Sequence, residues 1–144
     1  MMDFHEGGCL CKDVRYRVRG LPLDAIVCHC TFCQRRTGGA FGIEVFFPTE
    51  NVEFISSALK TFEHRSDESG RWLRVEFCPR CGTIVGMTAE RRPGQQVLMG
   101  GTFDDPNWFT MNRHVWTRSK VHWVDIPTGV PHFPTAPGSM TTEI

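Results

Sequence analysis

Short stretches in which apolar and polar residues alternate run through most of this chain, and long helical periodicity is absent. Val14, Tyr16 and Val18 alternate with three arginines, which is the period-2 pattern of a half-buried strand. We interpret those arginines as the solvated face of the strand rather than as an anion site. A short helical turn followed by a loop is expected over 34–39. Further strands, bounded by glycine, proline or small polar residues, are predicted over 25–28, 41–47, 52–55, 59–62, 72–77, 83–87 and 96–99. The pattern predicts a mostly β fold.

Length and charge narrow the class of protein. The 144 residues suit one domain with its own hydrophobic core. The formal net charge is zero, so no basic excess is available to neutralise phosphates, and nucleic-acid binding is not expected. No apolar run approaches the roughly 20 residues that span a bilayer. We therefore expect no membrane partner.

The two ends of the chain carry little signal. Residues 1–6 resemble a loose lead-in, and they lack the cationic and apolar regions of a signal peptide, which favours a cytoplasmic location. Beyond Pro131 the composition turns to proline, threonine, serine and glycine, and the last ten or so residues are expected to be poorly ordered.

The seven cysteines are the strongest chemical signal in the sequence. An odd number excludes complete disulfide pairing within one chain, and the spacings C-x-C, C-x-C-x-x-C and C-x-x-C are those of metal ligands rather than of disulfides. Thiolates are soft anionic ligands that suit zinc. The candidate ligands are Cys9 and Cys11, then Cys28, Cys30 and Cys33, then Cys78 and Cys81.

Two divisions of these thiols satisfy the four-coordination of structural zinc. In the first, Cys9 and Cys11 complete the Cys78–Cys81 knuckle and leave three thiols as a separate site with a vacant position. In the second, Cys30 and Cys33 complete the knuckle and the other cysteines are incidental. Spacing alone does not decide between them, but a vacancy would be the mark of a catalytic or ligand-exchanging metal.

Three motifs in order carry a resemblance to a known family. They are Gly8-Cys9-Leu10-Cys11, Cys28-His29-Cys30-Thr31-Phe32-Cys33 and Phe77-Cys78-Pro79-Arg80-Cys81-Gly82, and they are followed by His114-Val115-Trp116, Ser119-Lys120 and Trp123. Together they resemble the glutathione-dependent formaldehyde-activating enzymes, a family that includes the centromere protein V domain. The resemblance covers residues 4–126 and leaves 127–144 as a C-terminal tail.

This resemblance implies a fold and two metal sites. The fold would be a β-tent of small antiparallel sheets with zinc knuckles. A structural zinc would be held by Cys9, Cys11, Cys78 and Cys81, and a second, more labile zinc by Cys28, Cys30 and Cys33.

The implied activity is that of a zinc-dependent carbon–sulfur lyase. It would condense glutathione, or a similar thiol, with formaldehyde or a related small aldehyde to give an S-hydroxymethyl adduct, with Cys28, Cys30 and Cys33 as the catalytic centre. The expected partners are that thiol and that aldehyde, with a homodimer as an option. The alternatives are a non-catalytic zinc-binding interaction module, or an enzyme of the same scaffold that acts on a different thiol adduct.

Four other side chains are weaker candidates near this centre. His29 is the nearest titratable group and could move a proton, but alternation along an extended chain turns it away from the cysteines. His114 is a second candidate of the same kind. Arg35 and Arg36 could bind glutathione carboxylates bidentately.

Overall fold

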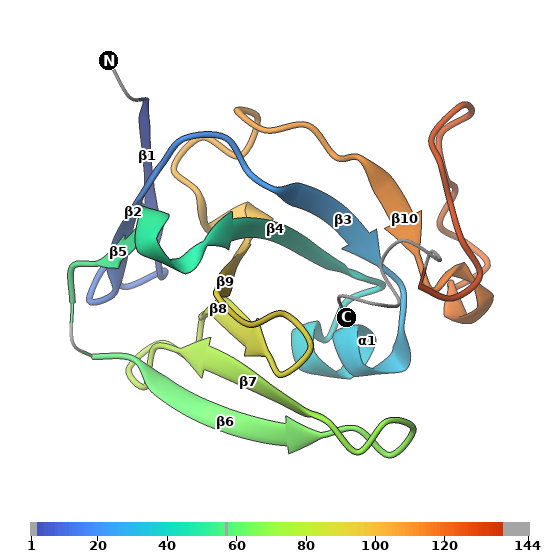
Figure 1. Cartoon of the computed structure of the whole chain (residues 1–144), viewed down its shortest axis with the longest axis horizontal. Coiled ribbons are helices and arrows are strands. Elements are labelled where there is room, and N and C mark those ends of the chain that lie inside the picture. Colours follow the sequence, from blue (N-terminus) through green and yellow to red (C-terminus); the bar gives the residue numbers. More distant parts are fainter. Residues whose placement is uncertain (1–2, 57, 137–144) are drawn as a thin grey trace.

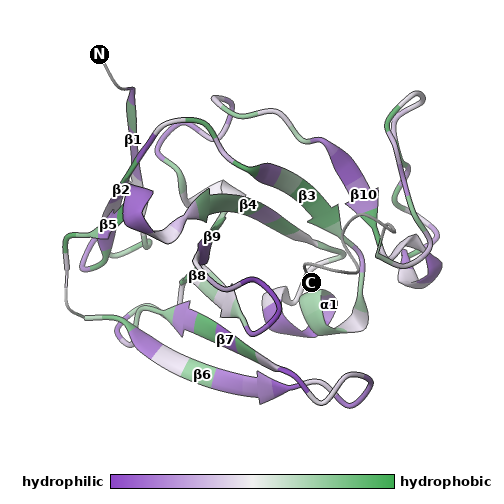
Figure 2. Ribbon diagram, viewed as in Figure 1, coloured by the Kyte–Doolittle hydropathy of each residue, from purple (hydrophilic) through white to green (hydrophobic). Residues whose placement is uncertain are grey.

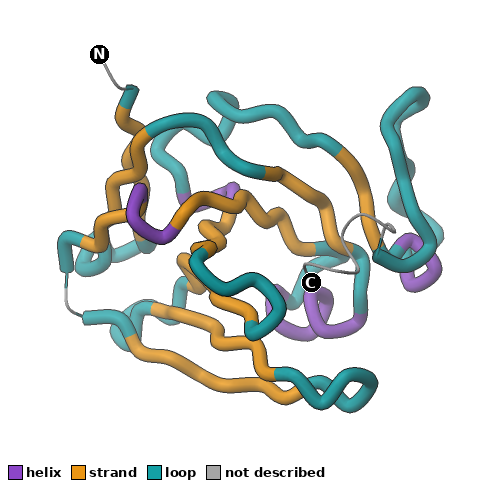
Figure 3. Tube along the Cα trace, in the orientation of Figure 1, coloured by secondary structure: helices purple, strands orange, loops and turns teal. Residues whose placement is uncertain are grey.

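The computed structural model describes residues 3–56 and 58–136, and it confirms the mostly β prediction. In the described part of the chain, ten strands form one sheet of three strands and one of seven, and one α-helix packs beside the larger sheet (Figures 1 and 3). The strands are β1 (Phe4–Gly8), β2 (Arg15–Arg19), β3 (Asp24–Cys28), β4 (Gly42–Pro48), β5 (Val52–Phe54), β6 (Lys60–Arg65), β7 (Trp72–Phe77), β8 (Ile84–Ala89), β9 (Gln95–Met99) and β10 (Arg113–Val115). The helix is α1 (Thr31–Thr37), and three 3-10 turns are η1 (Thr49–Asn51), η2 (Gly100–Thr102) and η3 (Thr117–Ser119).

The seven-stranded sheet has the order β10-β3-β4-β9-β8-β7-β6. All its neighbouring pairs are antiparallel except β10 and β3, which run parallel. The sheet curves strongly, so that β3 and β4 lie across from the β6–β7 hairpin and α1 lies between them (Figure 1). The curvature places the end of β3 and the start of α1 beside the concave face.

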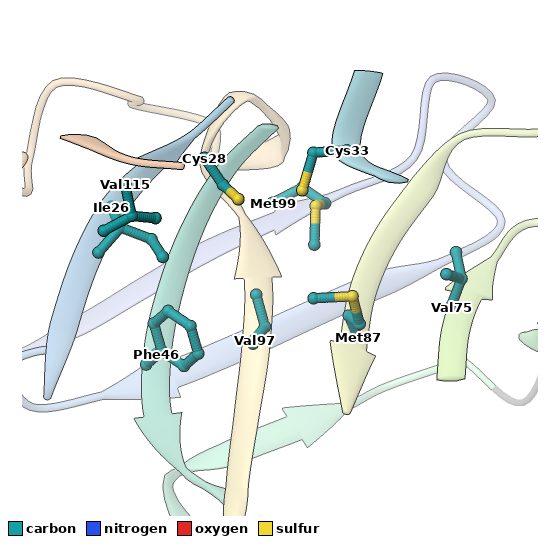
Figure 4. Packing of buried hydrophobic residues seen from close by; sticks show 9 residues of the cluster. All are labelled: Ile26, Cys28, Cys33, Phe46, Val75, Met87, Val97, Met99 and Val115. Atoms are coloured by element: carbon teal, nitrogen blue, oxygen red, sulfur yellow. The ribbon is translucent and has the colours of Figure 1, made fainter. Parts of the chain in front are cut away.

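Alternation along the central strands separates two hydrophobic clusters. Ala25, Val45 and Leu98 face the three-stranded sheet and pack with Tyr16 and other residues from it. Their neighbours along the strands, such as Ile26, Phe46 and Val97, face the concave side. They form a second cluster that includes Cys28, Cys33 and Met99 (Figure 4). Apolar residues dominate β3 and β4, whereas β6 is largely polar (Figure 2). The three-cysteine segment thus borders an apolar core.

The N-terminal prediction was wrong within the described residues. Residues 4–8 form β1, which pairs antiparallel with β2 from Phe4 opposite Arg19 to Gly8 opposite Arg15. The segment shows no alternation of its own, so its strand depends on its partner rather than on its pattern. Gly7 is required there, because a Cβ at this position would collide with the Tyr16 hydroxyl and the Thr102 carbonyl.

Other elements differ in extent from the predictions. The helix begins at Thr31 rather than near Gln34, because Cys30 caps it and accepts a hydrogen bond from the Cys33 amide. Beyond Pro131, the segment continues beside β10, with hydrogen bonds from His114 N to Pro131 O and from Phe133 N to His114 O. Most of the terminal segment expected to be poorly ordered, residues 137–144, lies outside the described residues. None of the helices in the described part of the chain has the length and apolar character needed to cross a bilayer.

Candidate metal centres

One cluster unites four sulfurs from two loops that are distant in sequence. Cys9 and Cys11 lie between β1 and β2, and Cys78 and Cys81 lie between β7 and β8. The four Sγ atoms lie within 4.8 Å of one another, with Cys11 Sγ 3.7 Å from Cys78 Sγ across a separation of 67 residues. The sulfurs are therefore grouped as in the first of the two divisions. We call this group the four-sulfur cluster.

Backbone amides and a hydroxyl surround these sulfurs. The Val14 amide donates to Cys9 Sγ at 3.2 Å, and the Thr83 hydroxyl lies 3.2 Å from Cys81 Sγ. Contacts to Thr83 lower the pKa of Cys81 to about 5, since they favour the thiolate. The turn after Cys81 closes through Gly82 at φ +79°, a conformation that favours glycine. This donor set suits thiolate coordination of a metal ion.

A second cluster lies within one strand–helix junction. Cys28 ends β3, Cys30 is the N-cap of α1 and Cys33 lies in its first turn, and their Sγ atoms lie within 4.8 Å of one another. Among the described residues, no further cysteine, histidine or carboxylate side chain has a ligand atom within 4.8 Å of all three sulfurs. Cys28 and Cys33 are buried, whereas Cys30 is partly exposed. We call this group the three-sulfur cluster.

Cys30 is the most acidic thiol of the three-sulfur cluster. Its pKa is lowered to about 3, first by the hydrogen bond from Cys28, then by the one from Cys33, with backbone amides adding to both. The pKa values of Cys28 and Cys33 are raised, since those thiols are the donors and are buried. Within the cluster, the hydrogen bonds therefore favour the thiolate form at Cys30 rather than at Cys28 or Cys33.

Two charged side chains adjoin Cys33 on the buried side. Cys33 Sγ lies 3.2 Å from Glu44 Oε1, and Arg36 Nη2 lies 3.5 Å from the same sulfur. Arg36 and Glu44 form a salt bridge of 3.3 Å, and their side chains are only 3% and 7% exposed. Burial raises the pKa of Glu44, and the charge of Arg36 opposes that shift. The sequence had a signal for Glu44, as it is the lone charge in the apolar run 41–47.

The two histidine candidates contact each other rather than the sulfurs. His29 Nε2 lies 2.8 Å from His114 Nδ1, and both side chains are buried. Burial, followed by the proximity of His114, lowers the pKa of His29 to about 4, so that it is neutral near pH 7. Arg35 is exposed on α1, unlike its neighbour Arg36.

A cavity of about 410 Å³ adjoins α1 and the turn between β7 and β8. Arg36 and Thr37 line it from α1, and Gly82 and Thr83 line it from the turn after Cys81. Its volume falls in the range of small-molecule sites. A larger cavity of about 520 Å³ lies at β1, where Glu6 is paired with Arg17. No cysteine is among the lining residues of either cavity, but Arg36, which contacts Cys33, lines the smaller one. We therefore favour the smaller cavity for chemistry that involves the sulfurs.

Fold and sites together define a small β-rich protein with two cysteine clusters, each able to hold a metal ion. The chain matches the glutathione-dependent formaldehyde-activating enzyme family over residues 4–119 and belongs to that family. A crystal structure of a Rhodobacter sphaeroides protein is similar with a TM-score of 0.55 and 18% sequence identity. The similarity covers 89% of this chain and 98% of that one, and it supports the fold alone. No curated protein matches the chain.

Proposed function

We propose that this chain is a zinc-dependent carbon–sulfur lyase that joins a thiol, glutathione in the first instance, to formaldehyde. The observation that carries the proposal is the three-sulfur cluster, whose ligand set is one short of the four that zinc ordinarily takes. Family membership supports a role in glutathione-dependent formaldehyde activation. The four-sulfur cluster is proposed to hold a structural zinc.

The proposed reaction is an addition that needs no redox partner. The thiol sulfur forms a bond to the formaldehyde carbon, the carbonyl π pair moves to oxygen, and the proton lost by the thiol ends on that oxygen. The product is the S-hydroxymethyl thioether, RS–CH₂OH. A zinc ion bound at the three-sulfur cluster would either keep a thiol deprotonated near neutral pH or polarise a carbonyl oxygen.

The chain's own residues supply the ligands and their orientation. Cys28, Cys30 and Cys33 would hold the metal, with Cys30 on the partly exposed side where a fourth ligand can approach. The Cys33 amide fixes the Cys30 sulfur through a 3.3 Å hydrogen bond. Arg35 is exposed and is proposed to bind a glutathione carboxylate. Arg36 instead forms a salt bridge with Glu44 and contacts the Cys33 sulfur.

The proposal is tested by NMR exchange spectroscopy on glutathione and ¹³C-formaldehyde, with and without zinc-loaded protein. We expect the protein to accelerate exchange between free formaldehyde and the adduct. The Cys30→Ser variant should return the rate to that of the protein-free mixture, since serine keeps the helix cap but removes one sulfur ligand. Wild-type protein that gives only the protein-free rate would refute the enzyme and favour the interaction module.

A further inference from the structure

Arg36 is held in an unusual place for an arginine, between a cysteine sulfur and a buried carboxylate. Its Nη2 lies 3.5 Å from Cys33 Sγ and 3.3 Å from Glu44 Oε1, and its Nη1 donates to Met99 Sδ at 2.9 Å. The side chain is 3% exposed. The guanidinium is therefore fixed against the three-sulfur cluster rather than extended into solvent.

The neighbouring strand leaves room for this guanidinium. Gly42 lies opposite Cys28 in the β3–β4 pair. A Cβ at Gly42 would collide with Arg36 Nη2 and would lie only 3.3 Å from Cys33 Sγ. The absence of a side chain at Gly42 thus allows Arg36 to reach the sulfur.

With a metal ion bound, the three-sulfur cluster would carry a negative charge that a fixed cation offsets. Three thiolates around a divalent ion leave a net charge of −1, and an anionic thiol as fourth ligand makes it −2. Glu44 adds further negative charge on the same buried side when it is ionised. Uncompensated charge of this kind is costly away from water. A guanidinium stays protonated at any working pH, so Arg36 supplies one positive charge throughout.

From this geometry we infer that Arg36 is a positioning residue, which orients the Cys33 sulfur and balances the negative charge of the three-sulfur cluster. In this role it sets how tightly the cluster retains a metal ion. The inference rests on the metal that the proposed function places at Cys28, Cys30 and Cys33, but not on the proposed reaction. It therefore makes a claim about metal affinity that holds for any substrate.

The test compares Arg36→Gln with Arg35→Gln in the full chain. Both variants remove one positive charge from α1, but Arg35 is exposed, whereas Arg36 lies against the Cys33 sulfur. Cobalt(II) is titrated against a chromophoric chelator while its thiolate charge-transfer bands are followed. We expect Arg36→Gln to lower the affinity of the weaker site by roughly ten- to a hundred-fold, as is typical for the loss of an outer-shell partner. Arg35→Gln, titrated like the others without glutathione, should match the wild type in cobalt affinity.

Two further variants test whether Arg36 acts on the sulfurs or only neutralises Glu44. Gly42→Ala keeps the arginine but displaces its guanidinium, so it should weaken the same site in a protein that still holds Arg36. The double variant Arg36→Gln with Glu44→Gln removes both charges of the salt bridge. If Arg36 serves the sulfurs, the double variant still loses cobalt. If it only neutralises Glu44, affinity returns to the wild-type value and the inference is overturned.

The outcomes also distinguish this inference from the proposed function. A wild-type chain that binds one cobalt ion would overturn both, because the three-sulfur cluster would then hold no metal. A wild-type chain that binds two, with Arg36→Gln and Gly42→Ala both equal to Arg35→Gln, would overturn only the role of Arg36.

Discussion

The two cysteine clusters should contribute unequally to stability, and a pair of variants can compare them. Cys11→Ser with Cys81→Ser leaves Cys9 and Cys78, one buried sulfur from each loop of the four-sulfur cluster. Cys30→Ser leaves two buried sulfurs in the three-sulfur cluster. In each case only partly exposed sulfurs are removed, so the cost of burying a serine hydroxyl is small and the lost metal cross-link dominates.

The difference in stability follows from the length of chain that each metal would close. Between Cys11 and Cys78 the four-sulfur cluster spans 67 residues, and the chain-entropy relation for a cross-link gives about 4 kcal/mol for a loop of that length. The three-sulfur cluster spans five residues from Cys28 to Cys33, for which the same relation gives about 2 kcal/mol. The double variant should therefore lose about 2 kcal/mol more unfolding free energy than Cys30→Ser does.

Urea unfolding of the reduced, zinc-loaded proteins measures this difference, with circular dichroism as the signal. A parallel series with excess chelator is the control, because the variants should approach the wild type once no metal cross-links the chain. Equal destabilisation in zinc would refute the reasoning, since both clusters would then constrain the chain alike. A difference that persists in chelator would show that the side chains, rather than the cross-link, are responsible.

Three other predictions concern the metal content, the binding of glutathione and a buried carboxylate outside the two clusters. Elemental analysis of the reduced wild type should give two zinc ions per chain and that of Cys30→Ser one, and a single ion in the wild type would contradict the second site. Millimolar glutathione should change the cobalt–thiolate bands of the wild type, and unchanged bands would argue for the interaction module. Asp24→Ala should cost about 3–5 kcal/mol in urea unfolding, because the largely buried Arg92 and Arg113 lose this carboxylate. A loss below about 1 kcal/mol would contradict that burial argument.

Alternation predicted β2, which buries one face, whereas β3 and β4 were predicted from short apolar runs, since both of their faces are largely buried. The alternating stretch from Val14 to Val18 overlaps β2 (Arg15–Arg19). Its apolar residues are fully buried, while Arg15 and Arg17 pair with acids of the chain itself. β1 was not predicted, because its extended conformation depends on pairing with β2 rather than on a pattern of its own. β10 is only three residues long and joins the sheet in parallel, which no local pattern reveals.

Sequence spacing identified every sulfur of the two clusters but not their grouping. Cys78 and Cys81 can share a metal with either of the other cysteine motifs, and only the pairing of distant loops decides between them. The resemblance to the formaldehyde-activating enzymes implied the grouping that the structure shows. Arg36 was recognised only as a possible carboxylate ligand, because spacing along α1 does not show that Gly42 and Glu44 enclose its guanidinium.

The arrangement of the clusters would allow one chain to combine a stable fold with the exchangeable metal ligand of the proposed function. Metal at the four-sulfur cluster would hold together two loops of the β1–β2 and β7–β8 hairpins, so ligand loss there would release a long segment. Metal at the three-sulfur cluster would lie within one strand–helix junction that hydrogen bonds and the apolar core already hold. A substrate thiol could therefore enter and leave the vacant position while the fold stays closed. This separation of roles is the physical reason to place the proposed thiol chemistry at Cys28, Cys30 and Cys33 and not at the four-sulfur cluster.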